Sequence, residues 1–488
     1  MGYKQSVNVF QKIYMKKSVT FILESEKVEN WVLIFLNHLS TDYQISVINL
    51  TSPKLTKKQR IINISSSKII AFEQRLSSTL KNNWYSLRET SSLLNDNSSE
   101  DGIIINLSNS EYPNSISLWS QDKRITLNNL NVICYYKRGV PITLFAASNN
   151  KKILSYRTSN NNFFLSSRKN NLVAAITDLL YYTITKNKSK NYHQVELPEK
   201  NSASFIRYAF SYVYNLVRIK FDAIKNNRKW HIGILGPDDK LKILKLPKGE
   251  FWADPFLIKT NEKLKIVFER MPENRKNGVI TQYDLNSGNF NDILEEPFHL
   301  SFPYPFYKNG AQFFIPETKQ NRSIKLYRMD VTGERLTYNS TLKENIETVD
   351  NAIFEHNNYL WLFTTIKTTP LSNSGDVLMI FYSDSLNSQW KEHELNPIKL
   401  DNSTARNAGT IFKENKKLFR PVQNCSYRYG GSVKLMEITK LTTNEFEEIE
   451  NKEFQPKQFN KNAISLHTYS KHENYTCIDL LIKTSEIN

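Results

Sequence analysis

Acidic side chains recur at two fixed positions within a segment that repeats through the C-terminal half of the chain. Asp254 and Asp350 stand four residues before an apolar anchor residue of the repeat. Glu269 and Glu317 stand eleven residues after an anchor, and Gln423 holds the same position in a later unit. Carboxyl groups that share one site can divide the roles of proton donor and base between them, because each environment sets its own pKa. We therefore expect acid–base chemistry from this set.

The repeat itself predicts the elements that must position these groups. Its anchors recur every 48, 48, 58 and 57 residues, at Ile258, Phe306, Phe354, Phe412 and Tyr469. Each unit is an apolar run, a polar turn about three residues after the anchor, and a second apolar run, which is the pattern of a β-hairpin. A period of about 40 to 50 residues with several short strands is typical of propeller blades, since one blade cannot bury both faces alone. Five units fit residues 229–488.

The hairpin geometry predicts that the acidic set meets at one mouth of the propeller. If the first strand leaves the rim and the second returns to it, the start of one strand lies beside the end of the next. Basic and imidazole side chains fall at similar phases of the repeat; these are Arg270, His299, Arg406, Arg420 and His467. A polar plug that hydrogen-bonds neighbouring backbone is the alternative for any one of them. For the whole set we favour a functional role, because several carboxylates in one cavity repel unless something uses them.

Short motifs in the propeller segment occur in the same order as in a known family. They are Phe251-Trp252-Ala253-Asp254-Pro255-Phe256, His299-Leu300-Ser301-Phe302-Pro303, Pro316-Glu317-Thr318, Trp361-Leu362-Phe363, Arg420-Pro421-Val422-Gln423-Asn424-Cys425, Tyr429-Gly430 and Leu466-His467-Thr468. The last 260 or so residues thereby resemble the propeller domain at the N-terminus of plant glucosamine inositolphosphorylceramide transferase, which is also similar to bacterial proteins labelled formyltransferase-like. A more distant resemblance extends to the arabinanase, levansucrase and invertase propellers.

The distant resemblance implies roles for individual carboxyl groups. In those propellers an aspartate of the first blade is the base or nucleophile and a glutamate of a later blade is the acid. By that likeness Asp254 is the base or nucleophile, Glu317 is the general acid, and Asp350 sets their pKa values or replaces Glu317 as partner. The substrate-binding residues we expect are Trp252, Glu269, Arg270, His299, Arg406, Arg420, Gln423, Tyr429 and His467. We expect no metal ligand set, and a nucleotide-sugar donor is the one cofactor we consider.

The same residues also fit two functions without catalysis. In a glycan-binding module, Trp252, Phe302 and Tyr304 would stack on sugar rings while the carboxylates bind hydroxyl groups. In a scaffold, the propeller would bind protein. We favour a sugar ligand because the repeated polar residues predict a lined cavity. The plant family carries its transferase chemistry in a separate domain, and we find no such domain or Asp-x-Asp motif in this sequence, so we expect any activity to come from the propeller or the N-terminal part.

Charge divides the chain into two parts. The 488 residues are 40% apolar and 23% charged, which is typical of a globular protein with two or three domains. Residues 1–229 hold 32 Lys and Arg against 15 Asp and Glu, whereas residues 230–488 are balanced, so the first part carries the whole net charge of +17. This favours an anionic partner such as lipid headgroups, a nucleotide or an acidic glycan, unless a lysine-rich sequence bias explains it. Nucleic acid is disfavoured, because the positive charge is dispersed and no binding motif accompanies it.

Apolar patterns in residues 1–200 predict an α/β domain. Strands are expected at 18–24, 45–50, 102–107, 132–136 and 142–145, and helices at 28–39, 69–80 and 172–185. The formyltransferase-like label of the bacterial relatives would fit such a layer in a degenerate form. We do not expect formyl transfer itself, because His38 is the only histidine of the first 190 residues and sits at a predicted helix end. Residues 201–228 predict a linker helix, with a membrane-surface helix as the alternative.

The sequence thus predicts an α/β N-terminal domain followed by an all-β five-bladed β-propeller. No secretory signal is recognisable at the N-terminus, and three cysteines, Cys134, Cys425 and Cys477, fit a reducing compartment. We expect a cytoplasmic protein that contacts the inner face of a membrane. Its expected function is glycosyl cleavage or transfer in the assembly of a cell-surface glycan or glycolipid, with a glycan or glycolipid as ligand. A non-catalytic module that positions substrate for a partner enzyme is the alternative.

Overall fold

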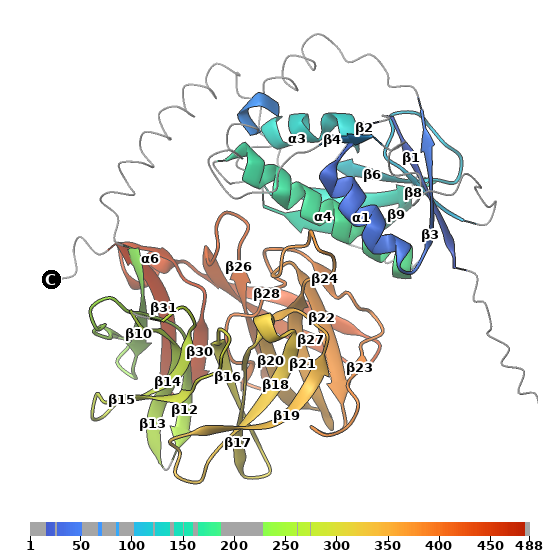
Figure 1. Ribbon diagram of the computed structural model, residues 1–488. Coiled ribbons are helices and arrows are strands. Elements are labelled where there is room, and N and C mark those ends of the chain that lie inside the picture. The colour runs from blue at the N-terminus through green and yellow to red at the C-terminus, as the bar shows by residue number, and fades with distance from the viewer. Residues whose placement is uncertain are drawn as a thin grey trace, which may run out of the picture.

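The computed structural model describes residues 16–24, 27–50, 67–70, 84–86, 102–120, 123–136, 141–149, 151–159, 164–186, 228–260, 262–273 and 275–483. These residues form a propeller and an N-terminal part that lies against one side of it (Figure 1). The predicted linker helix at 201–228, apart from its last residue, and most of the predicted helix at 69–80 lie outside the described residues.

Five antiparallel sheets form the blades of the propeller, as the repeat predicts. The first blade is β12 (Phe251–Thr260), β13 (Lys263–Met271), β14 (Val279–Asp284) and β15 (Phe290–Leu294). The second is β16 (Ser301–Lys308), β17 (Ala311–Glu317), β18 (Ser323–Met329) and β19 (Leu336–Glu344). The third is β20 (Thr348–His356), β21 (Tyr359–Ile366), β22 (Val377–Ser383), β23 (Lys391–Glu392) and β24 (Lys399–Leu400). The fourth is β25 (Phe412–Glu414), β26 (Lys417–Asn424), β27 (Ser432–Leu441) and β28 (Phe446–Phe454). A short helix, α6 (Pro456–Phe459), leads to the fifth.

The fifth blade combines strands from the two ends of the propeller segment. Its order is β11 (Leu241–Ile243), β10 (Arg228–Leu235), β31 (Tyr475–Lys483) and β29 (Ala463–Ser465), and β30 (Tyr469–His472) also pairs with β31. Antiparallel pairing of β10 with β31 runs from Arg228 opposite Lys483 to Leu235 opposite Thr476. This pairing closes the ring, because it joins the first propeller strand to the last blade through backbone hydrogen bonds.

The described N-terminal residues contain a mixed sheet with helices packed on it. The sheet order is β3 (Gln44–Asn49), β1 (Ser18–Leu23), β5 (Ile103–Asn106), β6 (Ile116–Ser120), β8 (Ile142–Ser148) and β9 (Lys151–Thr158), with β7 (Lys123–Ile125) beside β6. A second, two-stranded sheet pairs β2 (Lys27–Glu29) with β4 (Trp84–Ser86). The helices are α1 (Asn30–Ser40), α3 (Leu130–Tyr136) and α4 (Leu165–Lys186), and short 3₁₀ turns lie at Leu127–Asn129 and Lys319–Asn321.

Only part of the predicted N-terminal domain can be compared with these elements. The pairs β1–β3, β1–β5 and β5–β6 are parallel, whereas β6–β8 and β8–β9 are antiparallel. The strand predicted at Val132–Tyr136 is wrong, because this segment is the helix α3, whose Ile133 and Cys134 are buried against the sheet and α4. A short apolar run fits a buried helix as well as a strand. An α/β domain over all of residues 1–200 stays a prediction.

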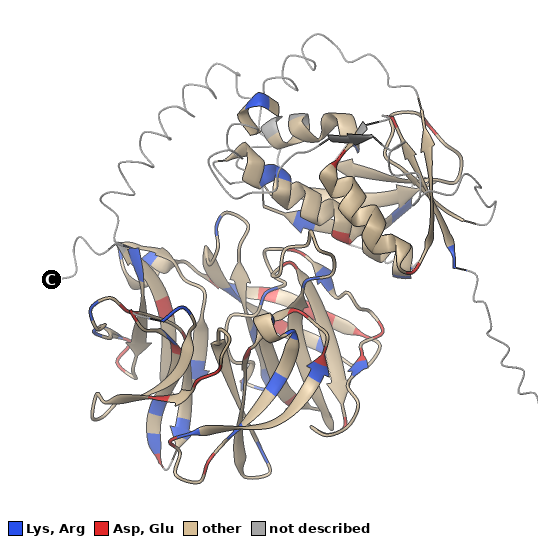
Figure 2. Cartoon of the chain, in the orientation of Figure 1, with Lys and Arg blue, Asp and Glu red and all other residues tan. Residues whose placement is uncertain are grey.

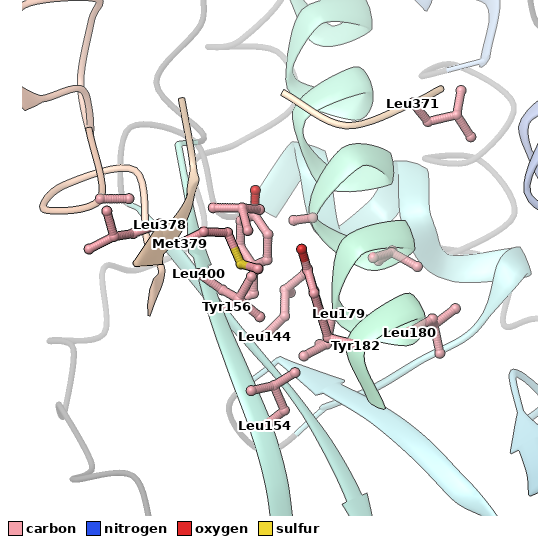
Figure 3. Packing of buried hydrophobic residues seen from close by; sticks show 14 of the residues in the cluster. Leu144, Leu154, Tyr156, Leu179, Leu180, Tyr182, Leu371, Leu378, Met379 and Leu400 are labelled. Carbon is pink, nitrogen blue, oxygen red and sulfur yellow. The ribbon is translucent and has the colours of Figure 1, made fainter. Parts of the chain in front are cut away.

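One apolar core runs across the boundary between the N-terminal part and the third blade (Figure 3). Figure 3 shows Tyr156 of β9 and Leu179 of α4 close to Leu378, Met379 and Leu400 of the propeller. Polar contacts follow the same boundary. The Tyr156 hydroxyl donates to Asp376 at 3.0 Å, the Tyr182 hydroxyl lies 2.8 Å from Thr368, and Ser372 bonds Asp178. The two parts therefore share one core.

Both signs of charge occur along the described strands of the propeller. Figure 2 shows Lys and Arg interspersed with Asp and Glu along the propeller strands, as expected from its balanced composition. Across the described residues, no helix has both the length and the apolar character that a membrane crossing requires.

Candidate active site

Two of the predicted acidic residues sit at a β-bulge that recurs in the innermost strands. The β12–β13 register shifts between Ala253 and Phe256, and β16–β17 and β20–β21 shift at the equivalent places. Each bulge contains one residue with left-handed backbone, and these are Asp254 at φ 51°, Phe302 at 44° and Asp350 at 50°. A bulge bends the strand and redirects a side chain. Here it directs the carboxyl groups of Asp254 and Asp350 toward groups from neighbouring blades.

Asp254 is held by the fifth and second blades. Its Oδ1 accepts a hydrogen bond of 3.0 Å from the Thr468 hydroxyl and lies 3.6 Å from His467 Nε2. Its Oδ2 accepts one of 3.2 Å from the Phe302 amide. The other imidazole nitrogen, His467 Nδ1, lies 2.5 Å from Asp479 Oδ2. Asp254 and His467 are only 7% and 3% exposed, so this network is nearly sealed from solvent.

Asp350 is held by the fourth blade. Its Oδ2 bonds Arg406 Nε and accepts a hydrogen bond of 2.9 Å from Gln423 Nε2, and its amide donates to Glu317 Oε2 at 3.4 Å. Gln423 Nε2 also donates to the carbonyl of Asn407 at 3.0 Å. The structure thereby brings together the predicted residues Glu317, Asp350, Arg406 and Gln423 from three blades.

Glu269 joins the site together with His299. His299 Nδ1 accepts a hydrogen bond of 2.8 Å from the Gly278 amide, so the ring proton is on Nε2, which lies 3.3 Å from Glu269 Oε1. A Cβ atom on Gly278 would lie 2.6 Å from the Leu300 carbonyl oxygen and 3.0 Å from Glu269 Oε1. Glycine at this position therefore allows the close approach of His299 and Glu269.

Burial and mutual repulsion separate the proton affinities of these acids. Burial raises the pKa of Asp254 to about 6, His467 opposes this rise, and Asp479 and Asp350 add to it. Burial and the charge of Asp350 raise the pKa of Glu317 to about 8, against the opposing effect of Arg406. Burial and neighbouring carboxylates also hold the pKa of Glu269 well above its usual range. At neutral pH, Asp254 is therefore largely ionised while Glu317 carries a proton.

The pKa values of the two histidines in the site shift in opposite directions. Burial opposes the charge of His467, but the nearby carboxylates of Asp479 and Asp254 raise its pKa above the usual value. Burial lowers the pKa of His299, which agrees with a neutral ring that accepts from Gly278. His467 can therefore balance the charge of Asp254, whereas His299 serves as a neutral donor toward Glu269.

Three predicted substrate-binding residues lie outside this cluster. Arg270 follows Glu269 on the strand and so points to the opposite face of the sheet, where it pairs with Glu250 at 2.6 Å and Asp292 at 2.9 Å. Arg420 has no exposed area and pairs with Glu448 at 2.6 Å. Trp252 is 1% exposed and packs on Phe268, with ring centroids 4.7 Å apart. Trp252 and Arg420 are therefore buried, and Arg270 is held in ion pairs on the other face of its sheet.

The two other aromatic residues proposed for sugar stacking are also buried. Phe302 is fully covered and packs against Phe256, with ring centroids 4.9 Å apart. Tyr304 is 2% exposed, and its hydroxyl accepts a hydrogen bond of 3.1 Å from the Ile411 amide. Alternation along β16 does not keep these rings out of the core, because residues of an innermost strand pack against blades on both sides.

Two residues of the site escaped the sequence reasoning. Asp479 accepts the amides of His467 and Thr468 at 3.1 and 2.9 Å and the amide of Asp254 at 3.0 Å. Trp230 of β10 stacks on His467 with ring centroids 4.0 Å apart and an angle of 11°. Neither belongs to the phases that the other units define, since β10 comes from before the repeat and the fifth hairpin has a different register.

The fifth hairpin, which carries Asp479, differs in register from the other four. In the first four units the anchor pairs with the residue seven positions later, as Ile258 does with Lys265. In the fifth, Tyr469 pairs with Ile478, nine positions later, because the turn falls one residue later than predicted. Asp479 stands ten residues after its anchor, one position before the place where Glu269 and Glu317 lie in their units, so the repeat alone does not single it out.

A metal ion is compatible with one corner of this site. Asp254, His467 and Asp479 each offer a ligand atom, and these atoms lie within 4.8 Å of one another. Carboxylate oxygen and imidazole nitrogen are ordinary ligands of divalent transition metals. However, Asp479 already accepts three backbone amides, so the group is also explained as a hydrogen-bond network without an ion.

Comparison with known proteins supports the resemblance found in the motifs. Residues 245–475 match the family model described as glucosamine inositolphosphorylceramide transferase 1, N-terminal. The propeller resembles that N-terminal domain. The transferase 1 protein of Oryza sativa subsp. japonica is 34% identical over 213 residues, which are 41% of this chain and 28% of that protein. The Arabidopsis thaliana protein is 30% identical over 221 residues, or 41% and 27%. The match thus spans little more than a quarter of these relatives.

Two solved structures that align with part of this chain are glycoside hydrolases by name. The α-L-arabinanase of Cellvibrio cellulosa in complex with arabinohexaose aligns over 41% of this chain and 77% of its own, with 11% identity and a TM-score of 0.31. The catalytic domain of the GH62 α-L-arabinofuranosidase of Coprinopsis cinerea aligns over 48% and 90%, with 12% identity and a TM-score of 0.36.

Proposed function

We propose that this protein cleaves or transfers a glycosyl unit at the end of the propeller where Asp254, Glu317 and Asp350 meet. The observation that carries the proposal is the convergence of acidic groups from three blades on one site in different protonation states. Asp254, with a pKa of about 6, is an ionised base or nucleophile at neutral pH, and Glu317, with a pKa of about 8, is a proton donor. Glycosyl chemistry requires this division of roles.

Each remaining group has a place in this proposal. Asp350 contacts one of the two catalytic candidates: its amide donates to Glu317, and its carboxylate pairs with Arg406. Its charge raises the pKa values of Asp254 and Glu317, which keeps a proton on Glu317 near neutral pH. His467 balances Asp254, and Gln423 fixes Asp350. A transfer reaction needs an activated sugar, for which a nucleotide-sugar donor is the natural choice.

The printed names of the relatives support a carbohydrate or glycolipid ligand. The rice and Arabidopsis proteins are transferases named for glucosamine and inositolphosphorylceramide. We extend from these names only the chemical class, a sugar attached to or transferred onto a glycan or lipid acceptor. The basic N-terminal part would supply contact with anionic lipid at the cytoplasmic face of a membrane.

A second candidate, a glycan-binding module without catalysis, is favoured by one specific observation. The oxygens of Asp254 already accept hydrogen bonds from Thr468 and Phe302, and Asp479 is fully engaged with backbone amides. A carboxylate so occupied has fewer lone pairs for a reacting group. In this case the same residues would hold sugar hydroxyls and position the substrate for a partner enzyme.

Complementation of a gene deletion separates these functions in the cell. We expect the deletion to change a cell-surface glycan or glycolipid, and wild type to restore it. Catalysis predicts that Asp254→Asn and Glu317→Gln each fail to restore the product, whereas Glu344→Gln, the same change at an exposed position in the second blade, restores it. Restoration by both site variants would argue against catalysis by these carboxyl groups. A deletion that changes no glycan or glycolipid would contradict the proposal.

A further inference from the structure

Trp230, His467 and Tyr429 form an aromatic corner beside the carboxyl groups. The Trp230 and His467 rings stack in parallel, with centroids 4.0 Å apart at 11°. The Tyr429 ring stands almost perpendicular to both, 6.5 Å from Trp230 at 89° and 5.3 Å from His467 at 79°. Three flat surfaces from strand β10 and two loops therefore meet at one point.

Solvent reaches two of the three rings. Tyr429 is 50% exposed and Trp230 is partly exposed, whereas His467 is only 3% exposed. The imidazole covers one face of the Trp230 indole. The corner thus presents aromatic surface from Trp230 and Tyr429, with His467 as its buried base.

The corner is held rigidly by its backbone. Gly430 has a φ of +55°, and a Cβ atom there would lie 2.7 Å from His467 Cβ, so only glycine lets the Tyr429 loop pack so closely. The Leu466 amide donates to the Gly430 carbonyl at 2.8 Å, and the Ser465 hydroxyl donates to that of Tyr429 at 3.3 Å. A ring fixed in advance loses little conformational entropy when a ligand binds.

Both sides of the corner connect to the catalytic candidates. His467 Nε2 lies 3.6 Å from Asp254 Oδ1. The Arg406 guanidinium lies over the Tyr429 ring at 4.9 Å from its centroid, donates to the Tyr429 hydroxyl at 3.4 Å, and binds Asp350. The corner is therefore linked through His467 to Asp254, and through Arg406 to Asp350.

We propose that Trp230 and Tyr429 form a stacking subsite for a neutral pyranose ring of the substrate. The apolar C–H face of a pyranose packs on flat aromatic surface, and its peripheral hydroxyls require polar partners such as Arg406 and the carboxylates. This inference rests on the proposed function, because it assigns the sugar that is held beside the reacting groups. Trp230 and Tyr429, which solvent can reach, thereby take the stacking role that the sequence suggested for the buried rings of Trp252, Phe302 and Tyr304.

Calorimetric titration of the full chain with a panel of neutral oligosaccharides and methyl glycosides tests the subsite. Trp230→Ala and Tyr429→Ala should each weaken the affinity at least about tenfold, whereas Trp230→Phe, which keeps a flat ring, should stay within about threefold. Tyr338→Ala is the matched control, since Tyr338 is 57% exposed in the second blade. Indole fluorescence that responds to sugar in wild type and not in Trp230→Phe would locate the ligand at this ring.

The outcomes separate the subsite from the proposed function. Unchanged affinity in Tyr429→Ala, and in Trp230→Ala if it folds, would overturn the subsite. Loss of binding in Asp254→Asn in the same series would leave the glycan function standing. Absence of binding to every saccharide by wild type would overturn both. Tyr429→Ala decides the matter should Trp230→Ala fail to fold, because the exposed Tyr429 ring contributes less to the core.

Discussion

Asp254 and Asp350 occupy the same position in the first and third blades, each in a left-handed backbone conformation at the bulge of an innermost strand. Phe302 has this conformation at the equivalent place in the second blade, so the bulge belongs to the blade and the carboxyl groups are specific to two of its copies. Asparagine tolerates left-handed backbone nearly as well as aspartate does. Substitution by Asn therefore removes the charge at either position and leaves the bulge intact.

The pair of Arg406 with Asp350 should be needed for stability as well as for any activity. Arg406→Gln leaves the Asp350 carboxylate buried with Gln423 as its remaining side-chain partner, which should lower the free energy of unfolding by about 3–5 kcal/mol. Adding Asp350→Asn removes the unpaired charge and should recover part of this loss. Urea denaturation of the two variants measures both effects, and equal stability of Arg406→Gln and wild type would show that the pair contributes nothing.

Any glycosyl activity should follow a bell-shaped pH profile. Asp254 must lose its proton to act as base or nucleophile, so the rate should rise as the pH increases through about 6. Glu317 must keep its proton to act as acid, so the rate should fall as the pH increases through about 8. Asp350→Asn removes a charge that raises both pKa values, and should shift both limbs to lower pH. Limbs that do not move in this variant would argue against the assigned groups.

Substitution of Arg420 tests whether this residue stabilises the fold or binds the ligand. Its guanidinium is paired with Glu448, whose pKa its charge helps to lower to about 2 despite burial, and it also donates to the carbonyls of Thr404 and Ala405. Arg420→Met should destabilise the fold by about 3–5 kcal/mol, and Arg420→Met with Glu448→Met should be more stable than the single variant. The saccharide affinity of the folded double variant should equal that of wild type. A folded double variant that binds saccharide more weakly than wild type would show that Arg420 takes part in binding.

The shared core predicts that the N-terminal part and the propeller unfold together. Tyr156→Phe removes the donor to the buried Asp376 carboxyl, which should cost about 1–3 kcal/mol. Because both parts share this boundary, calorimetry should show one transition that moves as a whole to lower temperature. Tyr307→Phe, which removes a hydroxyl on the exposed side of the second blade, is the control. Two separate transitions, with only one moved by Tyr156→Phe, would mean that the parts unfold independently.

The local sequence pattern predicts the propeller and much of its site, but it does not predict the contacts between segments that are distant in the sequence. The alternation of apolar runs and turns predicts each hairpin, and the position in the hairpin brings Asp254, Glu317, Asp350 and Gln423 together. Closure of the ring by β10 lies outside the repeat, so Trp230 could not be placed. Arg420 and Trp252 carried the right chemistry at the right phase, but whether a side chain faces a ligand or a buried partner depends on the neighbouring strand. In the N-terminal part, a short apolar run at Val132–Tyr136 did not distinguish strand from helix.

The most direct test of the account is mass-spectrometric analysis of products formed by the purified protein. Wild type, Asp254→Asn, Glu317→Gln and the control Glu344→Gln would be incubated with sugar nucleotides and with extracted glycolipid and polysaccharide acceptors. We predict a new or cleaved glycoside with wild type and the control, and its loss by a factor of at least about 100 in both site variants. Product formed equally well by Asp254→Asn and Glu317→Gln, or no product from wild type, would contradict catalysis by these carboxyl groups.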